Sequence, residues 1–570
     1  MAKERARYAL LKQFLADGID LVFGNPGTTE ESILDELNQC PQIRYVMGLQ
    51  ESVVTAMADG YARVSKRPGI VQLHSAVGVG NAMAILYQAS RSFTPLVVFA
   101  CEVSTDHIVY DGFLGGDIAE IAKPVTKWST RVISPVQLLR VWRRALKVAM
   151  TPPQGPVFIS FPMDVLDAEI EADIYPTSFI DWHSAPSAES TRKAARYLAD
   201  AADPLIFIGD GVSLANAQDE VRQLSGQLGA PVYGVDYADP NASFRDPLFM
   251  GLVGHSFGRQ TRSICQRGDV ILIVGTPVFP ELFPVHEPYF RPGARIIHID
   301  LNPWEIAKNF RVDVPVYADP KAALGAINAK LAGSLAGKEP LINARRLRWI
   351  SEKEKTWEER NQQNKKLHGK SPLSPSEMCE VIARTIPPDT LVYDELITGT
   401  SDLLHHLRPD KPGSYYLGRG GCIGVGISGA IGAKLASPDQ PVLATSGDGS
   451  ALFVIQSLWT AVNQNLDITF LIANNHAYRI LKINLLHYWA DRRENKKPFP
   501  FMDLVNPRVD FVKIAEGFGA KGHYIKTAGE LETSLKNSFD GGGVHLLDVE
   551  VDGTIPEEIH PVISCHSGCA

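Results

Sequence analysis

Short apolar runs alternate along the chain with longer segments in which apolar residues recur every three to four positions. The short runs predict buried strands and the longer segments predict amphipathic helices. In the first part of the chain we expect helices at 52–63 and 81–90. The strands predicted there cover residues 21–23, 45–47, 70–73, 96–100 and 157–160. Strands that alternate with helices are typical of α/β domains built on parallel sheets.

Two further sets of runs repeat this pattern, and the second set has Rossmann-like spacing. They lie at 205–208, 231–233, 270–274 and 295–300, and at 390–393, 442–445, 468–472 and 544–549. A polar stretch at 175–190 reads as a linker, and the densely charged segment 345–366 predicts a solvated linker helix. The predicted fold class is therefore α/β, with three doubly wound parallel-sheet domains. The expected divisions are 1–180, 190–340, a linker helix at 341–372, 373–555 and a tail at 556–570.

Composition narrows the class of protein. The 570 residues are 45% apolar and 21% charged, which excludes global disorder. A net charge of -8 argues against a general nucleic-acid binder. The seven cysteines form no CxxC pair, so a disulfide scaffold or a zinc ribbon is not expected. The tail carries His560, Cys565, His566 and Cys569; they could ligate a metal, but a loose surface tail is the favoured interpretation.

Neither a leader peptide nor a membrane span is predicted. The N-terminus is charged and amphipathic, unlike a signal peptide. The apolar stretch at 70–90 is interrupted by His74, Asn81 and Gln88, which makes it a poor membrane span. We expect a soluble, cytoplasmic protein.

The most specific motif follows a predicted strand of the third set. Gly447, Asp448 and Gly449 come directly after 442–445, and Asn475 lies 27 residues beyond Asp448. That interval fits one helix, expected at 451–463, plus one strand, so the two loops should lie side by side. The Asp448 carboxylate, the Asn475 amide oxygen and a backbone carbonyl such as that of Ala477 are ligands for Mg²⁺ or Ca²⁺ rather than zinc.

This ligand set contains only one carboxylate. Because Mg²⁺ often completes its coordination with phosphate oxygens, the set suggests that the metal holds a diphosphate. The pattern matches the thiamin diphosphate motif, a GDG triplet followed by an Asn pair. A second GDG at 209–211 has no Asn pair at that distance and is interpreted as a turn.

Three polar residues follow successive predicted strands of the first set. A thiamin cofactor requires a carboxylate at its aminopyrimidine ring, and Glu51 is the candidate. Thr28 and His74 end the strands on either side. Taken singly, Glu51 could be a helix-dipole residue and His74 a structural histidine. Together they lie at the edge of a parallel sheet where ligands bind, which favours a site.

The chain resembles the thiamin diphosphate-dependent decarboxylase and acetohydroxyacid synthase superfamily, and within it the benzoylformate decarboxylases, over essentially its whole length. The segments that carry this resemblance are GNPGTTEE at 24–31, LQE at 49–51, DGYAR at 59–63, LHSAVGVGNAM at 73–83, KWS at 127–129, PGSYY at 412–416, GDGSALF at 447–453 and LWTA at 458–461. The resemblance implies a pyrimidine-binding domain, a central domain and a diphosphate-binding domain. It also implies a homodimer, usually paired into a tetramer, with thiamin diphosphate and Mg²⁺ held between the first domain of one subunit and the third of another.

The resemblance also assigns expected roles to residues. Glu51 would activate the cofactor, His74 would move protons, and Thr28 would contact the substrate carboxylate. Asp448, Asn475 and the Ala477 carbonyl would hold the metal. The residues expected at the cofactor are Thr398, Gly421, Ile423, Gly447, Gly449, Ser450 and Tyr478; Ile423 would wedge the cofactor into its bent shape, and Gly421 would accept from its 4′-amino group. The plausible walls of the substrate pocket are Phe113, Leu114, Ile480 and Leu481.

Some positions depart from the family pattern. Leu282 falls where benzoylformate decarboxylase has a second catalytic histidine, with His286 four residues on, and Cys422 replaces a glycine. The expected activity is nonoxidative decarboxylation of a 2-keto acid with an aromatic or bulky apolar side chain. A carboligase or lyase that uses an aldehyde is the alternative, because loss of the histidine would slow protonation. A noncatalytic binder and a flavin in the central domain are further alternatives.

Overall fold

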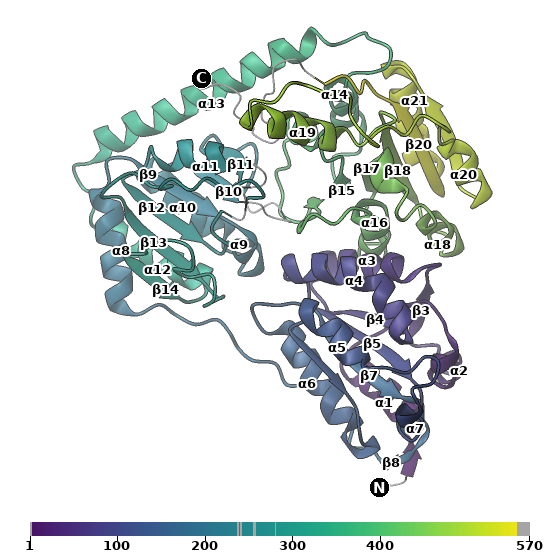
Figure 1. Ribbon diagram of the computed structural model, residues 1–570. Coiled ribbons are helices and arrows are strands. Elements are labelled where there is room, and N and C mark those ends of the chain that lie inside the picture. The colour runs from purple at the N-terminus through teal and green to yellow at the C-terminus, as the bar shows by residue number, and fades with distance from the viewer. Residues whose placement is uncertain (1–2, 236–238, 240–241, 255–257, 280, 556–570) are drawn as a thin grey trace.

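Three six-stranded sheets, each built only from parallel pairs, form the framework of the molecule (Figure 1). The computed structural model describes residues 3–235, 239, 242–254, 258–279 and 281–555. The predicted fold class, three α/β domains with parallel sheets, is confirmed. The tail with His560, Cys565, His566 and Cys569 lies outside the described residues.

The first domain places helices on both faces of its sheet. Its sheet strands are β2 (Leu21–Gly24), β3 (Arg44–Met47), β4 (Gly69–His74), β5 (Leu96–Glu102), β6 (Trp128–Arg131) and β7 (Val157–Pro162). Its α-helices are α1 (Ala6–Ala16), α2 (Glu31–Asn38), α3 (Glu51–Ser65), α4 (Ser75–Arg91), α5 (Ile118–Ala122), α6 (Leu138–Met150) and α7 (Met163–Asp167). A short antiparallel pair, β1 (Lys3–Arg5) with β8 (Glu169–Glu171), joins the two ends of this domain.

The central domain follows a segment without regular structure at 172–187. Its strands are β9 (Pro204–Ile208), β10 (Val232–Val235), β11 (Phe249–Val253), β12 (Val270–Val274), β13 (Arg295–Asp300) and β14 (Val314–Tyr317). Its helices are α8 (Ala188–Asp200), α9 (Asp210–Leu214), α10 (Gln218–Leu228), α11 (Gly258–Cys265) and α12 (Pro320–Ala332). The long helix α13 (Glu339–Lys365) then crosses to the third domain (Figure 1).

The third domain carries the GDG motif. Its strands are β15 (Leu391–Glu395), β16 (Tyr415–Leu417), β17 (Val442–Gly447), β18 (Ile468–Asn474), β19 (Lys521–Ile525) and β20 (Val544–Glu550). Its helices are α14 (Pro375–Thr385), α15 (Thr400–Leu407), α16 (Val425–Ala436), α17 (Asp448–Ala451), α18 (Ser457–Asn463), α19 (Arg479–Asp491), α20 (Phe511–Gly517) and α21 (Ala528–Gly541).

The first and third sheets share one strand order. They run β3-β2-β4-β5-β7-β6 and β16-β15-β17-β18-β20-β19, so in both the second strand of the domain lies outside the first. The central sheet runs β11-β10-β9-β12-β13-β14, the dinucleotide-fold order 3-2-1-4-5-6. The first and third domains therefore share one sheet topology. The edge at which ligands bind in such sheets is formed by equivalent strands in both domains.

Helices α3 and α16 join these two domains within the chain (Figure 1). A Cβ atom on Gly60 would lie 2.0 Å from the Gly429 carbonyl oxygen, so only glycine permits this approach. Buried residues of both helices, among them Met57 and Ile431, belong to one continuous apolar core. The outer domains therefore pack as a single block.

The structure differs from the sequence prediction in two respects. The helix expected at 451–463 is interrupted between α17 and α18, because Val454 and Ser457 bond to carbonyls three residues earlier instead of four. The pattern missed the short pair β1 and β8, and within the six-stranded sheets it missed β6, β11, β14, β16 and β19, which all lie at sheet edges. Within the part of the chain that the structure describes, none of the helices has the length and apolar character needed to cross a bilayer.

Candidate active site

The residues expected at the metal and diphosphate follow four neighbouring strands of the third sheet. Strands β16, β15, β17 and β18 lie side by side in that order. Their carboxyl ends lead to Gly421 and Ile423, to Thr398, to Gly447 and Asp448, and to Asn475. Gly447 pairs with Ala473 across β17 and β18, so the GDG loop and the Asn loop are adjacent, as the 27-residue interval predicted.

The Asp448 carboxylate is buried and organised by backbone N–H groups. Its Oδ1 accepts from Gly449 N at 2.9 Å, and its Oδ2 accepts from Ala477 N at 3.2 Å. The Asn475 amide oxygen accepts from the same Ala477 N–H at 3.0 Å, which brings both proposed ligands onto one loop. Burial raises the pKa of Asp448 to about 6. A buried carboxylate of this kind is stabilised by a cation, so the donors fit a hard metal ion.

This site would hold its metal with oxygen atoms of mixed type. Among the described residues, no group of three or more His, Cys, Asp or Glu side chains is placed to bind a metal. One carboxylate, one amide and one carbonyl leave coordination positions for phosphate oxygens and water, as Mg²⁺ prefers.

Backbone strain concentrates in the loops of this half-site. Ile397, directly before Thr398, has φ 56°, and His476, between Asn475 and Ala477, has φ 55°. A β-branched residue in the left-handed region is unfavourable and persists only where the surroundings impose it. The Tyr478 ring packs directly over Gly449, where a Cβ would lie 2.5 Å from Cε1. The loop after β18, which carries Tyr478, therefore packs tightly against the GDG loop after β17.

Sequence reasoning missed Glu395, the last residue of β15. Its Oε1 accepts from Gly424 N (2.8 Å) and Val425 N (3.1 Å), and its Oε2 accepts from Gly426 N (3.1 Å). A buried carboxylate thus caps the N-terminus of α16. It fixes the end of the loop that carries Gly421 and Ile423.

The first domain contributes Thr28, Glu51 and His74 from the ends of neighbouring strands β2, β3 and β4. Glu51 is the first residue of α3 and is buried, and its Oε2 accepts from Asn81 Nδ2 at 2.9 Å. A Cβ on Gly78 would lie 2.9 Å from Glu51 Oε1, so α4 makes room for the carboxylate. The predicted trio shares one edge of the sheet. Thr28 is exposed there, whereas Glu51 is almost fully covered.

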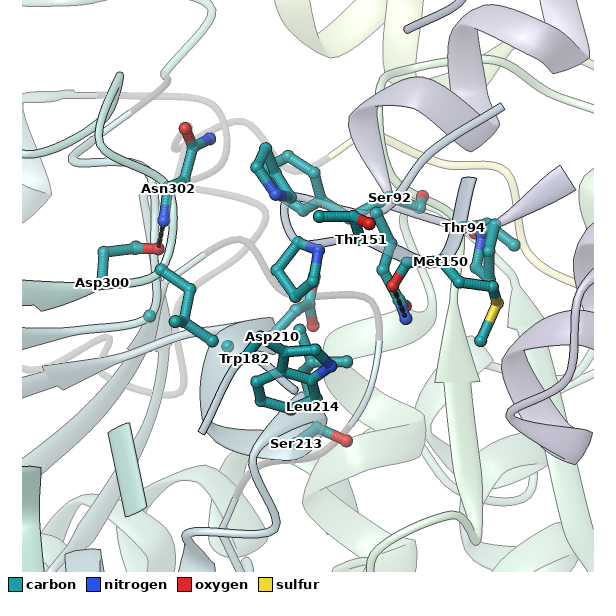
Figure 2. A pocket seen from close by; sticks show the side chains of 18 of the residues that line it. Ser92, Thr94, Met150, Thr151, Trp182, Asp210, Ser213, Leu214, Asp300 and Asn302 are labelled. Carbon is teal, nitrogen blue, oxygen red and sulfur yellow. Dashed lines mark hydrogen bonds between the residues drawn. The ribbon is translucent and has the colours of Figure 1, made fainter. Parts of the chain in front are cut away.

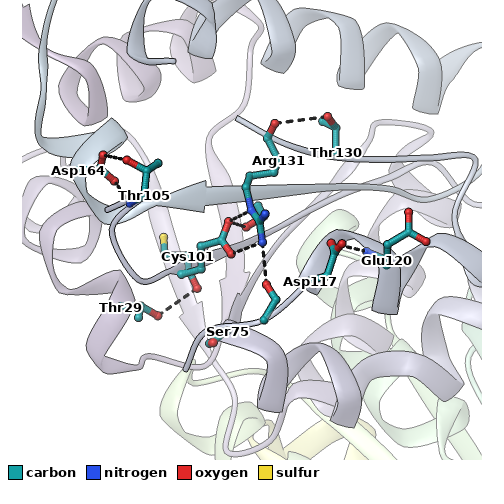
Figure 3. Close-up of polar contacts among 12 residues, drawn as sticks. Thr29, Ser75, Cys101, Thr105, Asp117, Glu120, Thr130, Arg131 and Asp164 are labelled. Atoms are coloured by element: carbon teal, nitrogen blue, oxygen red, sulfur yellow. Dashed lines mark hydrogen bonds and ion pairs between the residues drawn. The ribbon is translucent and has the colours of Figure 1, made fainter. Parts of the chain in front are cut away.

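A buried carboxylate, Glu30, orients His74. Glu30 Oε2 lies 2.8 Å from His74 Nδ1, and Oε1 accepts from Cys101 N and Thr29 Oγ1, both at 2.9 Å. Thr29 Oγ1 also lies within hydrogen-bond distance of the Cys101 carbonyl (Figure 3). Burial raises the pKa of Glu30, and the hydrogen bond from His74 opposes that rise. The pair holds the imidazole with Nδ1–H toward Glu30, which leaves Nε2 to exchange protons.

We expect Glu30→Gln to lower kcat by on the order of 10²-fold without unfolding the protein. The amide can donate to Nδ1, so the imidazole would carry its proton on Nε2, the wrong tautomer. Steady-state kinetics would show the loss, and thermal unfolding would show that the fold is retained. The neighbouring exposed Glu31→Gln is the matched control. A Glu30→Gln enzyme that keeps the wild-type kcat would contradict the role of the pair.

The expected pocket walls are only partly brought together. Ser75 Oγ donates to the Leu114 carbonyl at 2.8 Å, and Arg131 Nη2 donates to the Gly116 carbonyl at 2.7 Å. Figure 3 shows Ser75 and Arg131 near this loop. The loop is thus tied beside His74, yet Phe113 is 98% exposed. Leu282, 68% exposed, and His286 lie on the surface of the central domain, while Ile480 and Leu481 belong to the first turn of α19.

Comparison with known families covers all three domains. Family models described as thiamine pyrophosphate enzyme match in sequence order: the N-terminal TPP binding domain at residues 5–121, the central domain at 191–327 and the C-terminal TPP binding domain at 398–549.

Individual relatives divide between two activities. A benzoylformate decarboxylase of Pseudomonas aeruginosa is 28% identical, covering 95% of this chain and 98% of its own length. An acetolactate synthase large subunit of Haemophilus influenzae is 26% identical, covering 96% and 94%. The solved structure of a thiamine diphosphate-dependent 4-hydroxybenzoylformate decarboxylase of Rhodococcus jostii superposes with a TM-score of 0.81 at 26% identity, covering 96% of this chain and 99% of that one.

Proposed function

The chain belongs to the thiamine pyrophosphate enzyme family, and on this basis we propose that it decarboxylates a 2-keto acid with an aromatic or bulky apolar side chain, without oxidation. The observation that carries the proposal is the contact between buried Glu30 and partly exposed His74, at the edge that also bears Glu51. Release of an aldehyde after loss of CO₂ requires a proton, and this pair is built to hold and deliver one. Two relatives, named as decarboxylases of benzoylformate and of 4-hydroxybenzoylformate, support the substrate class.

The residues at the two half-sites fit thiamin diphosphate with Mg²⁺. Asp448, Asn475 and the Ala477 carbonyl would hold the metal, and Thr398, Ser450 and Tyr478 would surround the diphosphate. When bound, the cofactor supplies a nucleophilic carbon and an electron sink for the electrons that CO₂ leaves behind.

The chain itself binds, orients and moves protons. Glu51 would hydrogen-bond the aminopyrimidine ring, and the Gly421 carbonyl would accept from the 4′-amino group. Ile423 would enforce the bent shape. Thr28 would contact the substrate carboxylate, and His74 Nε2 would hold the proton that is transferred after CO₂ leaves. Phe113, Leu114, Ile480 and Leu481 would enclose the side chain and exclude water.

A carboligase is the second candidate, and Leu282 favours it. Leu282 stands where the resemblance places a second histidine, so an aldehyde could compete with the proton for the intermediate that remains after CO₂ leaves.

The identity of the product distinguishes the two functions. By ¹H NMR, the protein with thiamin diphosphate and Mg²⁺ should convert benzoylformate, or another bulky 2-keto acid, to free aldehyde. A 2-hydroxyketone as the only product would assign carboligation instead.

We further propose that the active enzyme is a homodimer at minimum, with two dimers forming a tetramer. Apolar side chains around both half-sites are exposed in the single chain: Val77 and Tyr87 on α4, and Phe453 and Leu481 near the metal loop. A second copy would cover such surfaces. The first domain of one copy would then complete the site with the third domain of the other.

Mixing two inactive variants tests this arrangement. If each site combines two chains, co-expressed Glu51→Gln and Asp448→Asn chains should recover about one quarter of wild-type activity, because half of the dimers are mixed and each has one intact site. Purified mixed dimers are assayed against each variant alone. Absence of recovery in verified mixed dimers would place the whole site within one chain.

A further inference from the structure

A cavity of about 350 Å³ separates the first and central domains (Figure 2). The carboxyl edge of the central sheet supplies Asp210 and Asp300, the first domain supplies Thr94 and Met150, and the connecting segment supplies Trp182. This edge includes the point between β9 and β12 where the strand order reverses. In open α/β sheets that point is where a nucleotide is expected, with its phosphates at the N-terminus of the helix that follows the first strand.

The helix that follows β9 presents a carboxylate there. Asp210 is the first residue of α9, so its negative charge occupies the place where a phosphate would sit. Gly211 and Gly275 also pack directly together; a Cβ on Gly211 would lie 2.5 Å from the Gly275 Cα. Asp300 and Glu305 add buried carboxylates to the lining. The start of the helix, where the diphosphate of a flavin or a nucleotide would bind, is therefore already occupied by a carboxylate of the protein itself.

The Asp210 carboxylate forms an ion pair with Arg419 of the third domain. Arg419 Nη1 donates to Asp210 Oδ2 at 2.5 Å, and the Arg419 side chain is only 3% exposed. Its guanidinium carbon also lies 5.4 Å from the centre of the Phe93 ring of the first domain. Arg419 thus joins the third domain to both others at one point.

Arg419 begins the loop that contains Gly421 and Ile423. Directly after it, Gly420 has φ 91°, and a Cβ there would lie 3.0 Å from Gln88 Oε1 of α4. At the other end, Glu395 binds the N–H groups of Gly424 and Gly426. The loop is therefore held by Arg419 before its cofactor residues and by Glu395 after them.

We propose that Arg419, clamped by Asp210, is a positioning residue for the cofactor loop, and that the central crevice serves this clamp in place of a flavin or nucleotide. The inference rests on the proposed function, because it takes residues 421–423 as the cofactor contact. Loss of the clamp frees the loop and weakens cofactor binding, while the metal ligands that follow β17 and β18 remain in place.

Isothermal titration calorimetry with thiamin diphosphate and Mg²⁺ tests the clamp on full-length protein without turnover. Asp210→Asn and Arg419→Gln should each raise the cofactor Kd about tenfold or more, and the double variant should bind no more weakly than Arg419→Gln alone, since that change already removes the interaction with Asp210. The matched control is Lys66→Met. It breaks the Lys66–Asp239 ion pair (3.0 Å) across the same cavity without contacting the third domain, and should leave the Kd unchanged.

Equilibrium dialysis of the wild-type protein against FAD and against ADP should retain neither. Retention of either, or variants with the wild-type Kd, would overturn the inference while leaving the proposed function intact. A wild-type protein that does not bind thiamin diphosphate would instead overturn the proposed function and the inference with it. If Arg419→Gln does not fold, Asp210→Asn decides together with Asp210→Glu, which keeps the charge and should keep the affinity.

Discussion

Glu51→Gln should lower kcat by roughly 10²–10⁴-fold, the range over which a positioned acid or base acts. Glutamine has the shape of glutamate and can still reach Asn81 Nδ2, the 2.9 Å partner of the Glu51 carboxylate. It cannot accept a proton from the aminopyrimidine ring. Because the side chain is buried at the start of α3, water does not replace the missing function.

Steady-state kinetics and calorimetry with thiamin diphosphate measure the two consequences separately. Turnover should fall while cofactor affinity changes little, since the metal and diphosphate contacts lie on the third domain. Glu189→Gln, an exposed residue in the first turn of α8, is the control for the same change at a helix start. A Glu51→Gln enzyme that keeps more than a tenth of wild-type kcat would remove Glu51 from the mechanism.

Asp448→Asn should weaken Mg²⁺-dependent binding of thiamin diphosphate by at least about 100-fold, since residues that merely support metal ligands already contribute 10–100-fold. The Asp448 carboxylate is the charged member of a set completed by Asn475 and the Ala477 carbonyl. Asparagine can accept from only one of the Gly449 and Ala477 N–H groups, because its amide nitrogen is a donor, and it removes the negative charge that a divalent cation requires.

Calorimetry at fixed Mg²⁺ concentration checks this loss, and thermal unfolding without ligands checks that the fold is retained. Asp439→Asn, an exposed aspartate of the same domain, should bind as the wild-type protein does. An Asp448→Asn variant with native affinity would mean that the diphosphate is held without this metal site.

The sequence was sufficient for the strands that lie within the sheets and for the loops that follow them. Long apolar runs such as those of β5, β12 and β18 are buried on both faces, so their pattern is unambiguous. Of the six edge strands of these sheets, β3 was predicted and the other five were missed; in β14 and β19 the apolar run is interrupted. Strand β14 alternates buried Val314 with exposed Pro315, and β19 includes Lys521, Gly522 and His523.

At the site, the sequence predicted which loops carry functional residues, but it did not predict which side chains contact each other. Spacing placed Asp448 beside Asn475 because one helix and one strand separate them. Glu30 was overlooked because its partner His74 lies 44 residues away, and only the pairing of β2 with β4 brings them together. An acidic residue two positions after Thr28, in the turn that follows a predicted strand, was the available signal. Glu395 offered a similar signal at the end of β15.

The most direct test of the account is CO₂ release from benzoylformate by protein stripped of metal and cofactor. We expect release only when thiamin diphosphate and Mg²⁺ are both restored, with one equivalent of aldehyde per CO₂, and release at least about 100-fold slower from the Glu51→Gln variant. Release without thiamin diphosphate would contradict the account. So would the absence of release from benzoylformate, pyruvate and longer 2-keto acids with both restored.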